Sequence, residues 1–184
     1  MFRIIPWTKD LDLTEFYRIA ESKGFTNNSS QKMLVDCFDR EPEKCVWILY
    51  YNDMAVGSVA AHTFDIMGDN CYRIAARTCA FTDMIPYSSL RTRNQIVTHQ
   101  HVTSQFLIPV CIEWAPKGSR LFITSTDSDL GTQRLVHRIF GPSMEATGQM
   151  RNMGDVVYRN TNQTVWELFP DVFMNELNKY PRWV

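Results

Sequence analysis

Residues 45–64 read CVWILYYNDMAVGSVAAHTF and give the clearest structural signal in the chain. The first seven residues are a continuous apolar and aromatic run, Asn52 and Asp53 then form a turn signal, and the remaining residues are again rich in Val, Ala and Phe. β-Branched and aromatic residues favour strands, whereas Asn and Asp favour tight turns. The stretch therefore predicts two antiparallel strands joined by a short turn.

The next residues toward the C-terminus predict a third antiparallel strand. Gly68, Asp69 and Asn70 give a turn signal, and in residues 71–81 small or apolar side chains alternate with Arg73 and Arg77.

On the N-terminal side we expect a short strand at residues 2–5 and two amphipathic helices. The first helix has Asp12 and Glu15 as a capping pair and ends at Gly24, and the second begins at Asn28–Ser29 and ends before Pro42.

Helix and strand signals alternate in the C-terminal half. Apolar residues three or four apart predict a long helix over residues 94–115, kinked at Pro109. A buried strand is expected at residues 120–126, and the helix that follows it should stop at Gly141–Pro142. Two last strands, residues 156–158 and 164–169, should form a hairpin around a polar tip at residues 159–163, and the tail has room for one more helical turn.

Composition favours one soluble domain over residues 1–184. The formal net charge is −1, from 19 basic and 20 acidic residues. The chain therefore has no long-range electrostatic field that favours a nucleic acid or an anionic membrane as partner. The five cysteines have no CxxC spacing, and their odd number fits reduced, buried thiols and a cytoplasmic location. No run of about 18 apolar residues is present, and the N-terminal apolar run is too short for a signal peptide.

This order of elements, from the first helix to about Phe169, resembles the GCN5-related N-acetyltransferase (GNAT) superfamily. Residues 50–57 (YYNDMAVG) look like that family's turn between its second and third strands, and residues 136–141 (VHRIFG) are similar to the end of its penultimate helix. The resemblance implies an α/β fold with a mixed central sheet flanked by helices and splayed between residues 71–81 and 120–126. It also implies acyl transfer from acetyl-CoA, or another acyl-CoA, to a small-molecule or protein amine.

The resemblance places the cofactor phosphates at residues 90–96 (LRTRNQI). Arg91 matches the first position of the family's phosphate-binding signature, but Asn94 and Ile96 stand where small residues are usual. A helix N-terminus and arginine charge both attract anions, so we expect Arg91, Arg93, Asn94 and Gln95 to bind the phosphates. The alternative is that the two arginines are solvated surface residues.

His137 is the leading catalytic candidate, since it occupies the position of the family's acidic tyrosine, four residues before Gly141. An imidazole can donate a proton to the departing CoA thiolate near neutral pH. Asp83 replaces the glutamate that family members often carry on the third sheet strand. The alternative for His137 is an ordinary surface histidine on a helix, and the alternative for Asp83 is a turn residue at the end of a strand.

Two further readings of the sequence stay open. A binding domain of the same fold that has lost CoA chemistry is the alternative to an enzyme, and a homodimer is compatible with either.

His99 and His101 are two residues apart on the expected long helix and so face different sides, and we expect no metal site. The acyl acceptor is not selected by the sequence.

Overall fold

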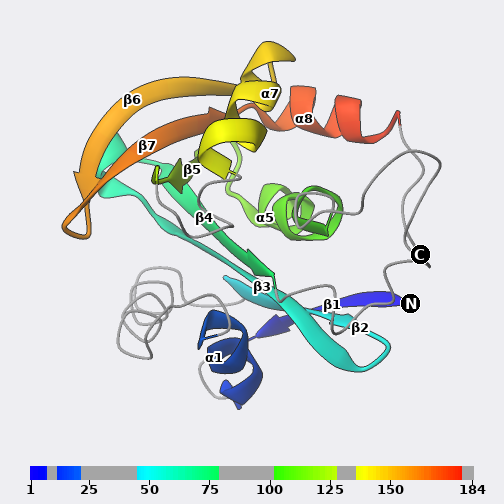
Figure 1. The fold of residues 1–184 in the computed structure, drawn as a ribbon. Helices are drawn as coiled ribbons and strands as arrows, with labels where there is room; N and C mark the ends of the chain where they lie inside the picture. The colour runs from blue at the N-terminus through cyan, green and yellow to red at the C-terminus, as the bar shows by residue number, and fades with distance from the viewer. Residues whose placement is uncertain (8–11, 22–44, 79–101, 128–135, 180–184) are drawn as a thin grey trace. The chain divides into compact units, whose positions relative to one another are not determined.

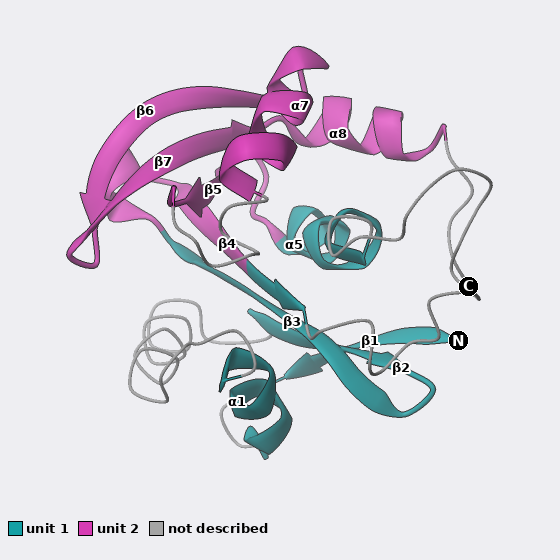
Figure 2. Cartoon of the chain, in the orientation of Figure 1, with its two compact units in different colours: residues 1–63, 76–114, 182–184 teal, residues 64–75, 115–181 magenta. Residues whose placement is uncertain are grey.

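The computed structural model describes residues 1–7, 12–21, 45–78, 102–127 and 136–179. The chain divides into two compact units, shown in different colours in Figure 2. Unit 1 comprises residues 1–63, 76–114 and 182–184, and unit 2 comprises residues 64–75 and 115–181. Each unit is described by itself below, and the single domain expected from the sequence stays a prediction.

Unit 1 is built on three antiparallel strands, β1 (Phe2–Trp7), β2 (Val46–Tyr51) and β3 (Met54–Thr63) (Figure 1). Asn52 and Asp53 connect β2 to β3 with φ angles of 45° and 70°. Two consecutive residues with positive φ are the requirement of the hairpin turn that matches strand twist. The strand pair predicted from residues 45–64 is therefore confirmed.

Helix α1 (Thr14–Glu21) packs Phe16, Ile19 and Ala20 into the core of unit 1. Asp12 accepts a hydrogen bond from the Thr14 backbone N–H at 2.9 Å, which satisfies one of the donors left open at a helix start. Glu15 does not complete a capping pair as predicted; it accepts from Arg18 at 2.8 Å instead. Arg18 also donates to the Ala55 carbonyl at 2.6 Å, which ties the helix to β3.

The described part of the predicted long helix begins at Val102. A π-helical turn, η3 (Thr103–Leu107), leads into α5 (Ile108–Trp114). Pro109 lies inside this continuous helical run, directly after the π-helical turn, and the chain stays helical through it. The π-helical turn replaces the regular i→i−4 hydrogen bonds that a proline interrupts. The earlier part of the expected helix, residues 94–101, lies outside the described residues, as does the second expected helix.

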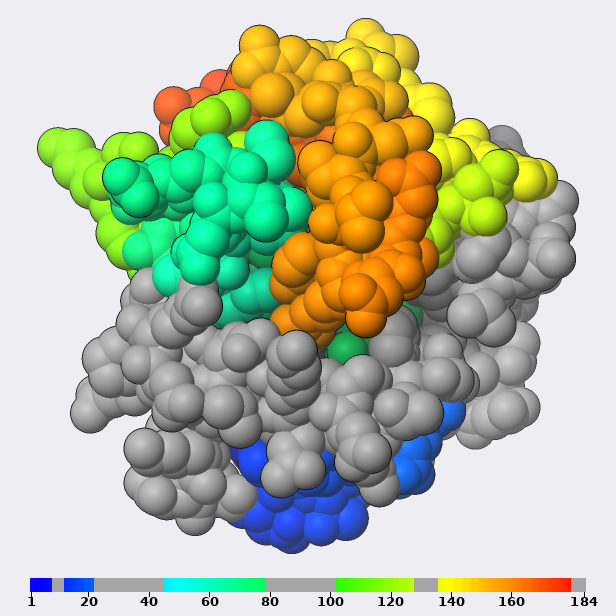
Figure 3. All heavy atoms as spheres, turned by 90° about the vertical axis from the view of Figure 1, so that its left-hand side faces the viewer, coloured from blue at the N-terminus to red at the C-terminus, as the bar shows by residue number. Residues whose placement is uncertain are grey.

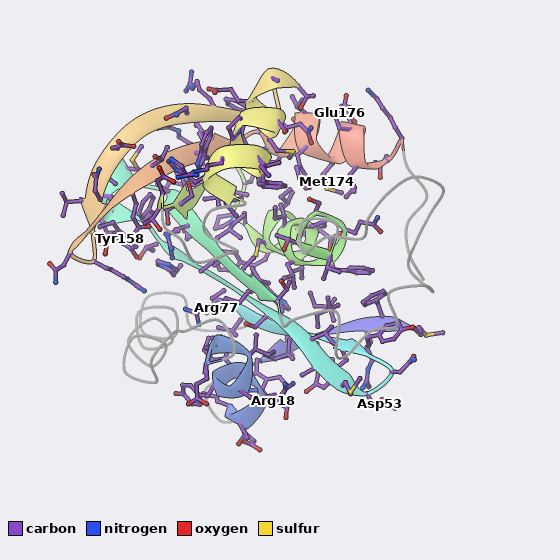
Figure 4. All side chains as sticks on the ribbon, viewed as in Figure 1. Arg18, Asp53, Arg77, Tyr158, Met174 and Glu176 are labelled. Carbon is purple, nitrogen blue, oxygen red and sulfur yellow. The ribbon has the colours of Figure 1, made fainter. Side chains whose placement is uncertain are left out.

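Arg77 is a charged residue in the core of unit 1. It lies on β4 (Cys71–Thr78), a strand whose last three residues belong to this unit. Its guanidinium carbon is 5.6 Å from the centroid of the Phe16 ring, and only 7% of the residue is exposed (Figure 4). The alternating pattern placed Arg77 on a polar side of the strand; the aromatic face of α1 covers it instead.

Unit 2 contains the start of β4 together with β5 (Arg120–Ser125), β6 (Met150–Tyr158) and β7 (Thr161–Leu168). β4 and β5 are parallel, while β5, β7 and β6 pair antiparallel in that order. With unit 1 the strand order is β1-β2-β3-β4-β5-β7-β6, a mixed sheet of α/β class.

The hairpin of β6 and β7 confirms the predicted hairpin with a shorter connection. Arg159 and Asn160, with φ of 52° and 60°, form a two-residue turn rather than a five-residue tip. β6 carries a bulge between Asn152 and Asp155, where Gly154 has a φ of 91° and donates its N–H to Asn152 Oδ1 at 2.8 Å. A left-handed backbone at that point favours glycine.

The described residues of unit 2 form the helical segments η1 (Asp65–Met67), the π-helical turn η4 (Val136–Phe140), α7 (Gly141–Ala146) and α8 (Pro170–Leu177). The expected helix stop at Gly141–Pro142 is wrong, because η4 runs without a break into α7, which has Gly141 and Pro142 in its first turn. Proline is tolerated there, because the π-helical turn before it replaces the regular i→i−4 hydrogen bonds. α8 provides the helical turn expected in the tail.

One face of the unit 2 sheet carries a small core of Phe64, Cys71, Phe122 and Val165. Cys71, like Cys45 and Cys111 in unit 1, is buried with a free thiol, as the cysteine count predicted. Burial raises the pKa of the Cys111 thiol well above its usual value. Within the described residues, no helix is long and apolar enough to cross a membrane.

Candidate functional site

His137 is the one predicted site residue that falls within the described chain. It lies on η4, half-buried, with its Nδ1 atom 3.3 Å from the hydroxyl oxygen of Ser125. Ser125 is the last residue of β5 and is fully buried. The end of a central strand therefore holds the imidazole in place.

Trp166 connects Ser125 to the neighbouring strand. Its register on β7 is opposite Ile123, so Trp166 and Ser125 are diagonal neighbours on one face of the sheet. The indole Nε1–H donates to Ser125 Oγ at 2.9 Å, and Trp166 is 3% exposed. A line of polar contacts thus runs from Trp166 on β7 through Ser125 to His137.

Gly141 follows η4 and touches the same indole. A Cβ atom at this position would lie 2.5 Å from Cζ2 and 2.6 Å from Cε2 of Trp166. Carbon atoms at contact are normally about 3.5–4.0 Å apart, so only glycine lets the helix approach the ring this closely. Trp166 therefore sets the position of the helical segment as well as that of the Ser125 hydroxyl.

A second link between the end of β5 and η4 lies one residue beyond His137. Arg138 forms an ion pair with Asp127, with 2.7 Å between the guanidinium NH2 nitrogen and Oδ1. Both side chains are about half exposed, at 49% and 51%, so the pair adds at most about 1 kcal/mol. Its geometric effect is to hold η4 against the chain that leaves β5.

The two parallel strands next to this site separate. β4 and β5 pair at three positions, and the last pair is Arg73 with Phe122. Within unit 2, β5 runs on to Ser125 and β4 to Ala75, yet among these described residues no further backbone pairing follows. The Arg73 side chain spans the first step of the opening, since its Nε–H donates to the Thr124 hydroxyl at 2.8 Å. Where two neighbouring strands stop exchanging backbone hydrogen bonds with each other, an inserted amide-bearing chain can pair with their edges. Ser125 and His137 stand at the open end of β5.

The face of the unit 2 sheet opposite Ser125 and Trp166, which also carries Phe122 and Val165, holds an ion cluster. Glu167 on β7 is 6% exposed and accepts from Arg120 at 2.6 Å and from Arg151 at 2.7 Å. These hydrogen bonds, that of Arg120 first, hold the pKa of the Glu167 carboxyl below its usual range. The cluster stabilises the sheet that positions Ser125 and Trp166.

The other predicted site residues lie outside the described residues: Asp83, Arg91, Arg93, Asn94 and Gln95. Their roles stay predictions, and so does the absence of a metal site. In the described part of the chain, no group of three His, Cys, Asp or Glu side chains is placed to hold a metal ion.

Ser125 and Trp166 were missed by sequence reasoning. Ser125 ends the β-rich run RLFITS, and Trp166 lies in a strand 41 residues away. Their contact depends on β7 pairing directly with β5, which no local pattern reveals. The only usable signal was a tryptophan at an inward-facing strand position, whose N–H needs a partner when buried.

Neither a protein-family model nor a curated protein sequence matches the chain. Solved structures do. A GNAT-family acetyltransferase from Desulfovibrio desulfuricans, described as putative, has a TM-score of 0.57 and 12% identity over 92% of this chain and 99% of its own. Diaminobutyrate acetyltransferase EctA from Paenibacillus lautus, in complex with L-2,4-diaminobutyric acid and coenzyme A, has a TM-score of 0.57 and 12% identity over 92% and 95%.

A third similar structure is the ribosomal-protein-S18-alanine N-acetyltransferase of Escherichia coli, with a TM-score of 0.57 and 11% identity over 91% of this chain and 93% of the other. At this level of identity the likeness shows the fold. The chain has the fold of GNAT acetyltransferases, as residues 50–57 and the order of elements predicted.

Proposed function

We propose that this chain is a divergent GNAT enzyme that transfers an acyl group, acetyl in the first instance, from an acyl-CoA to an amine. The observation that carries the proposal is the fork between β4 and β5, with His137 held by Ser125 at its open end. A fork between parallel strands suits a pantetheine arm, whose amides can pair with the open strand edges.

The reaction joins the acceptor nitrogen to the carbonyl carbon of the thioester. The C–N bond forms, the C–S bond breaks with its electron pair on sulfur, the nitrogen loses one proton and the sulfur gains one. His137 supplies a hydrogen-bond or proton donor for the sulfur. Asp83 receives the proton of the amine, directly or through water, and Arg91, Arg93, Asn94 and Gln95 bind the phosphates of the CoA.

The acceptor class is an amine, from a small molecule or a protein. Two proteins of this fold support it by their substrates: one is solved with diaminobutyrate, and another is named for the alanine of a ribosomal protein. We also propose that the reaction takes place in the cytoplasm, because the described cysteines are free thiols.

Two experiments, first on binding and then on turnover, test the proposal. Acetyl-CoA at 100 times its dissociation constant should stabilise the folded chain by about 2.7 kcal/mol in thermal unfolding. Release of free CoA is then followed spectroscopically with a panel of diamines, amino acids and peptides. Acetyl-CoA that neither stabilises the chain nor is consumed would overturn the proposal.

The second candidate is a binding domain without catalysis. The observation in its favour is that Asn94 and Ile96 stand where the family has small residues beside the pyrophosphate. The same experiment separates the two functions, because a binding domain that retains CoA shows the thermal shift without CoA release, and one that has lost CoA shows neither.

A further inference from the structure

The hydrogen bonds around Ser125 indicate which nitrogen of His137 carries hydrogen. An indole nitrogen only donates, so the hydrogen of Trp166 Nε1 points at Ser125 Oγ across 2.9 Å. The Ser125 hydroxyl has one hydrogen of its own and is shielded from water by complete burial. Among the described residues, its remaining hydrogen-bond partner is His137 Nδ1 at 3.3 Å. If Nδ1–H donated to Oγ instead, the buried hydroxyl hydrogen would have no acceptor among the described residues, and a buried donor left unsatisfied destabilises the fold. The arrangement that satisfies both groups has the hydroxyl hydrogen pointing at Nδ1.

We propose that Ser125 and Trp166 are positioning residues that fix uncharged His137 as the Nε2–H tautomer. An uncharged imidazole carries one hydrogen, on either nitrogen. Because Nδ1 accepts from Ser125, that hydrogen resides on Nε2, the nitrogen on the other side of the ring from Nδ1. The role of this tautomer in catalysis rests on the proposed acyl transfer, whereas the assignment of the hydrogen to Nε2 does not depend on it.

The Nε2–H tautomer makes His137 a hydrogen-bond donor during acyl transfer and excludes it as the base. As the C–S bond breaks, Nε2–H donates a hydrogen bond to the electron pair that develops on sulfur. The imidazole stays uncharged, the acceptor nitrogen releases its proton to water or a carboxylate, and the sulfur takes a proton from water. Atoms and charges balance without removing the Nε2 hydrogen, and Nε2–H cannot serve as the base that deprotonates the amine.

Trp166 acts on His137 at two points. Its N–H orients the Ser125 hydroxyl, and its ring lies against Gly141, directly after η4. Trp166→Phe retains an aromatic ring but removes the N–H, so it separates the two effects. Ser125→Ala removes one buried oxygen atom and leaves the ring of Trp166 in place.

Side-chain nitrogen NMR on the full chain, with ¹⁵N-labelled histidine and no acyl donor, tests the tautomer. His137→Gln identifies the His137 signals by their loss. In the uncharged imidazole of the wild-type chain, studied at alkaline pH, we expect hydrogen on Nε2 and a lone pair on Nδ1. In Trp166→Phe and in Ser125→Ala, both nitrogen shifts should move toward the average of two exchanging tautomers.

Trp47→Phe is the matched control, since Trp47 is equally buried, at 5% exposed, but lies on β2 in unit 1. It should leave the His137 signals unchanged. Ser125→Ala keeps the test available where Trp166→Phe leaves too little folded protein. Hydrogen on Nδ1 in the wild-type chain, or His137 signals that both variants leave unaltered, would overturn the inference.

Turnover distinguishes this inference from the proposed function. Where acyl transfer is observed, both variants should lower kcat by up to about 10²-fold, the usual effect of a small misplacement, with KM for the acyl donor unchanged. If the wild-type chain acylates an amine but carries its hydrogen on Nδ1, the positioning role is wrong and the proposed function stands. If the hydrogen is on Nε2 but the chain acylates no amine, the proposed function is wrong and the tautomer assignment stands.

Discussion

Gly141→Ala tests the close packing of the His137 segment on Trp166. The added Cβ would lie 2.5, 2.6 and 2.8 Å from Cζ2, Cε2 and Cη2 of the indole. To reach contact distance the ring or the helix must retreat by about 1 Å. The ring is held by its hydrogen bond to Ser125, so we expect an overpacking cost of about 1–3 kcal/mol.

Part of that cost is offset, because alanine is a better helix former than glycine by up to about 1 kcal/mol. The net loss of about 1–2 kcal/mol should lower Tm by roughly 2–8 °C in a chain of this length. Thermal and urea unfolding measure the effect. Ser143→Ala, an exposed change on the same helix, is the control and should stay within about 0.5 kcal/mol of the wild type.

A double-mutant cycle separates the clash from other effects of the substitution. In a Trp166→Leu background the ring is gone, so Gly141→Ala should become neutral or stabilising, with a coupling energy of at least about 1 kcal/mol. A Gly141→Ala chain that is as stable as the wild type, or more stable, would refute the reasoning, because helix propensity alone gives that result.

Three further changes test the ion cluster, the catalytic residue and the phosphate site. The pKa of Glu167 is depressed by Arg120 and Arg151, so its stabilisation is present above the unfolded carboxyl pKa of about 4.3 and is lost as pH falls through the lower folded value. In urea unfolding, the free energy of unfolding of the wild type should therefore exceed that of Glu167→Gln by about 1–2 kcal/mol at pH 7, and the two should be equal at strongly acid pH. A difference that stays constant with pH would contradict this. His137→Phe should lower kcat by about 10²–10³-fold with acetyl-CoA affinity intact; wild-type turnover would exclude His137 from the chemistry. Arg91→Ala and Arg93→Ala should each weaken CoA binding by up to about 1.5–3 kcal/mol in calorimetry while sparing pantetheine, and equal losses for both ligands would indicate a disturbed loop.

Local signals in the sequence predicted local structure well. The run before Asn52 and the run after Asp53 begin and end within a residue or so of β2 and β3, because turn residues and β-branched runs act over a few positions. The turn at Arg159 and Asn160 is shorter than predicted, since Thr161 and its neighbours pair despite their polarity. Pro142 was misread, because proline both ends helices and begins them.

The site depends on contacts that sequence spacing does not record. His137 was identified from its place before Gly141, but the Ser125 hydroxyl that orients it and the Trp166 N–H behind that hydroxyl come from β5 and β7. β7 lies between β5 and β6, so strands that follow each other in the chain are not the ones that pair with β5. The burial of Arg77 has the same cause, since α1 comes from a distant part of the sequence.

The bulge of β6 has a consequence for how the protein behaves in concentrated solution. β6 is the outermost strand of its sheet, and Figure 3 shows its orange spheres on the surface of the molecule. Its side chains include exposed Met153 and Val157, the latter 76% exposed. A straight outer strand of nine residues would offer an unbroken ladder of hydrogen-bonding groups to other chains. The extra residue at Gly154 interrupts that ladder, and the charged Arg151 and Asp155 on either side of it disfavour the approach of another strand. The strand is thereby protected against stacking into aggregates, even though its apolar side chains remain open to water.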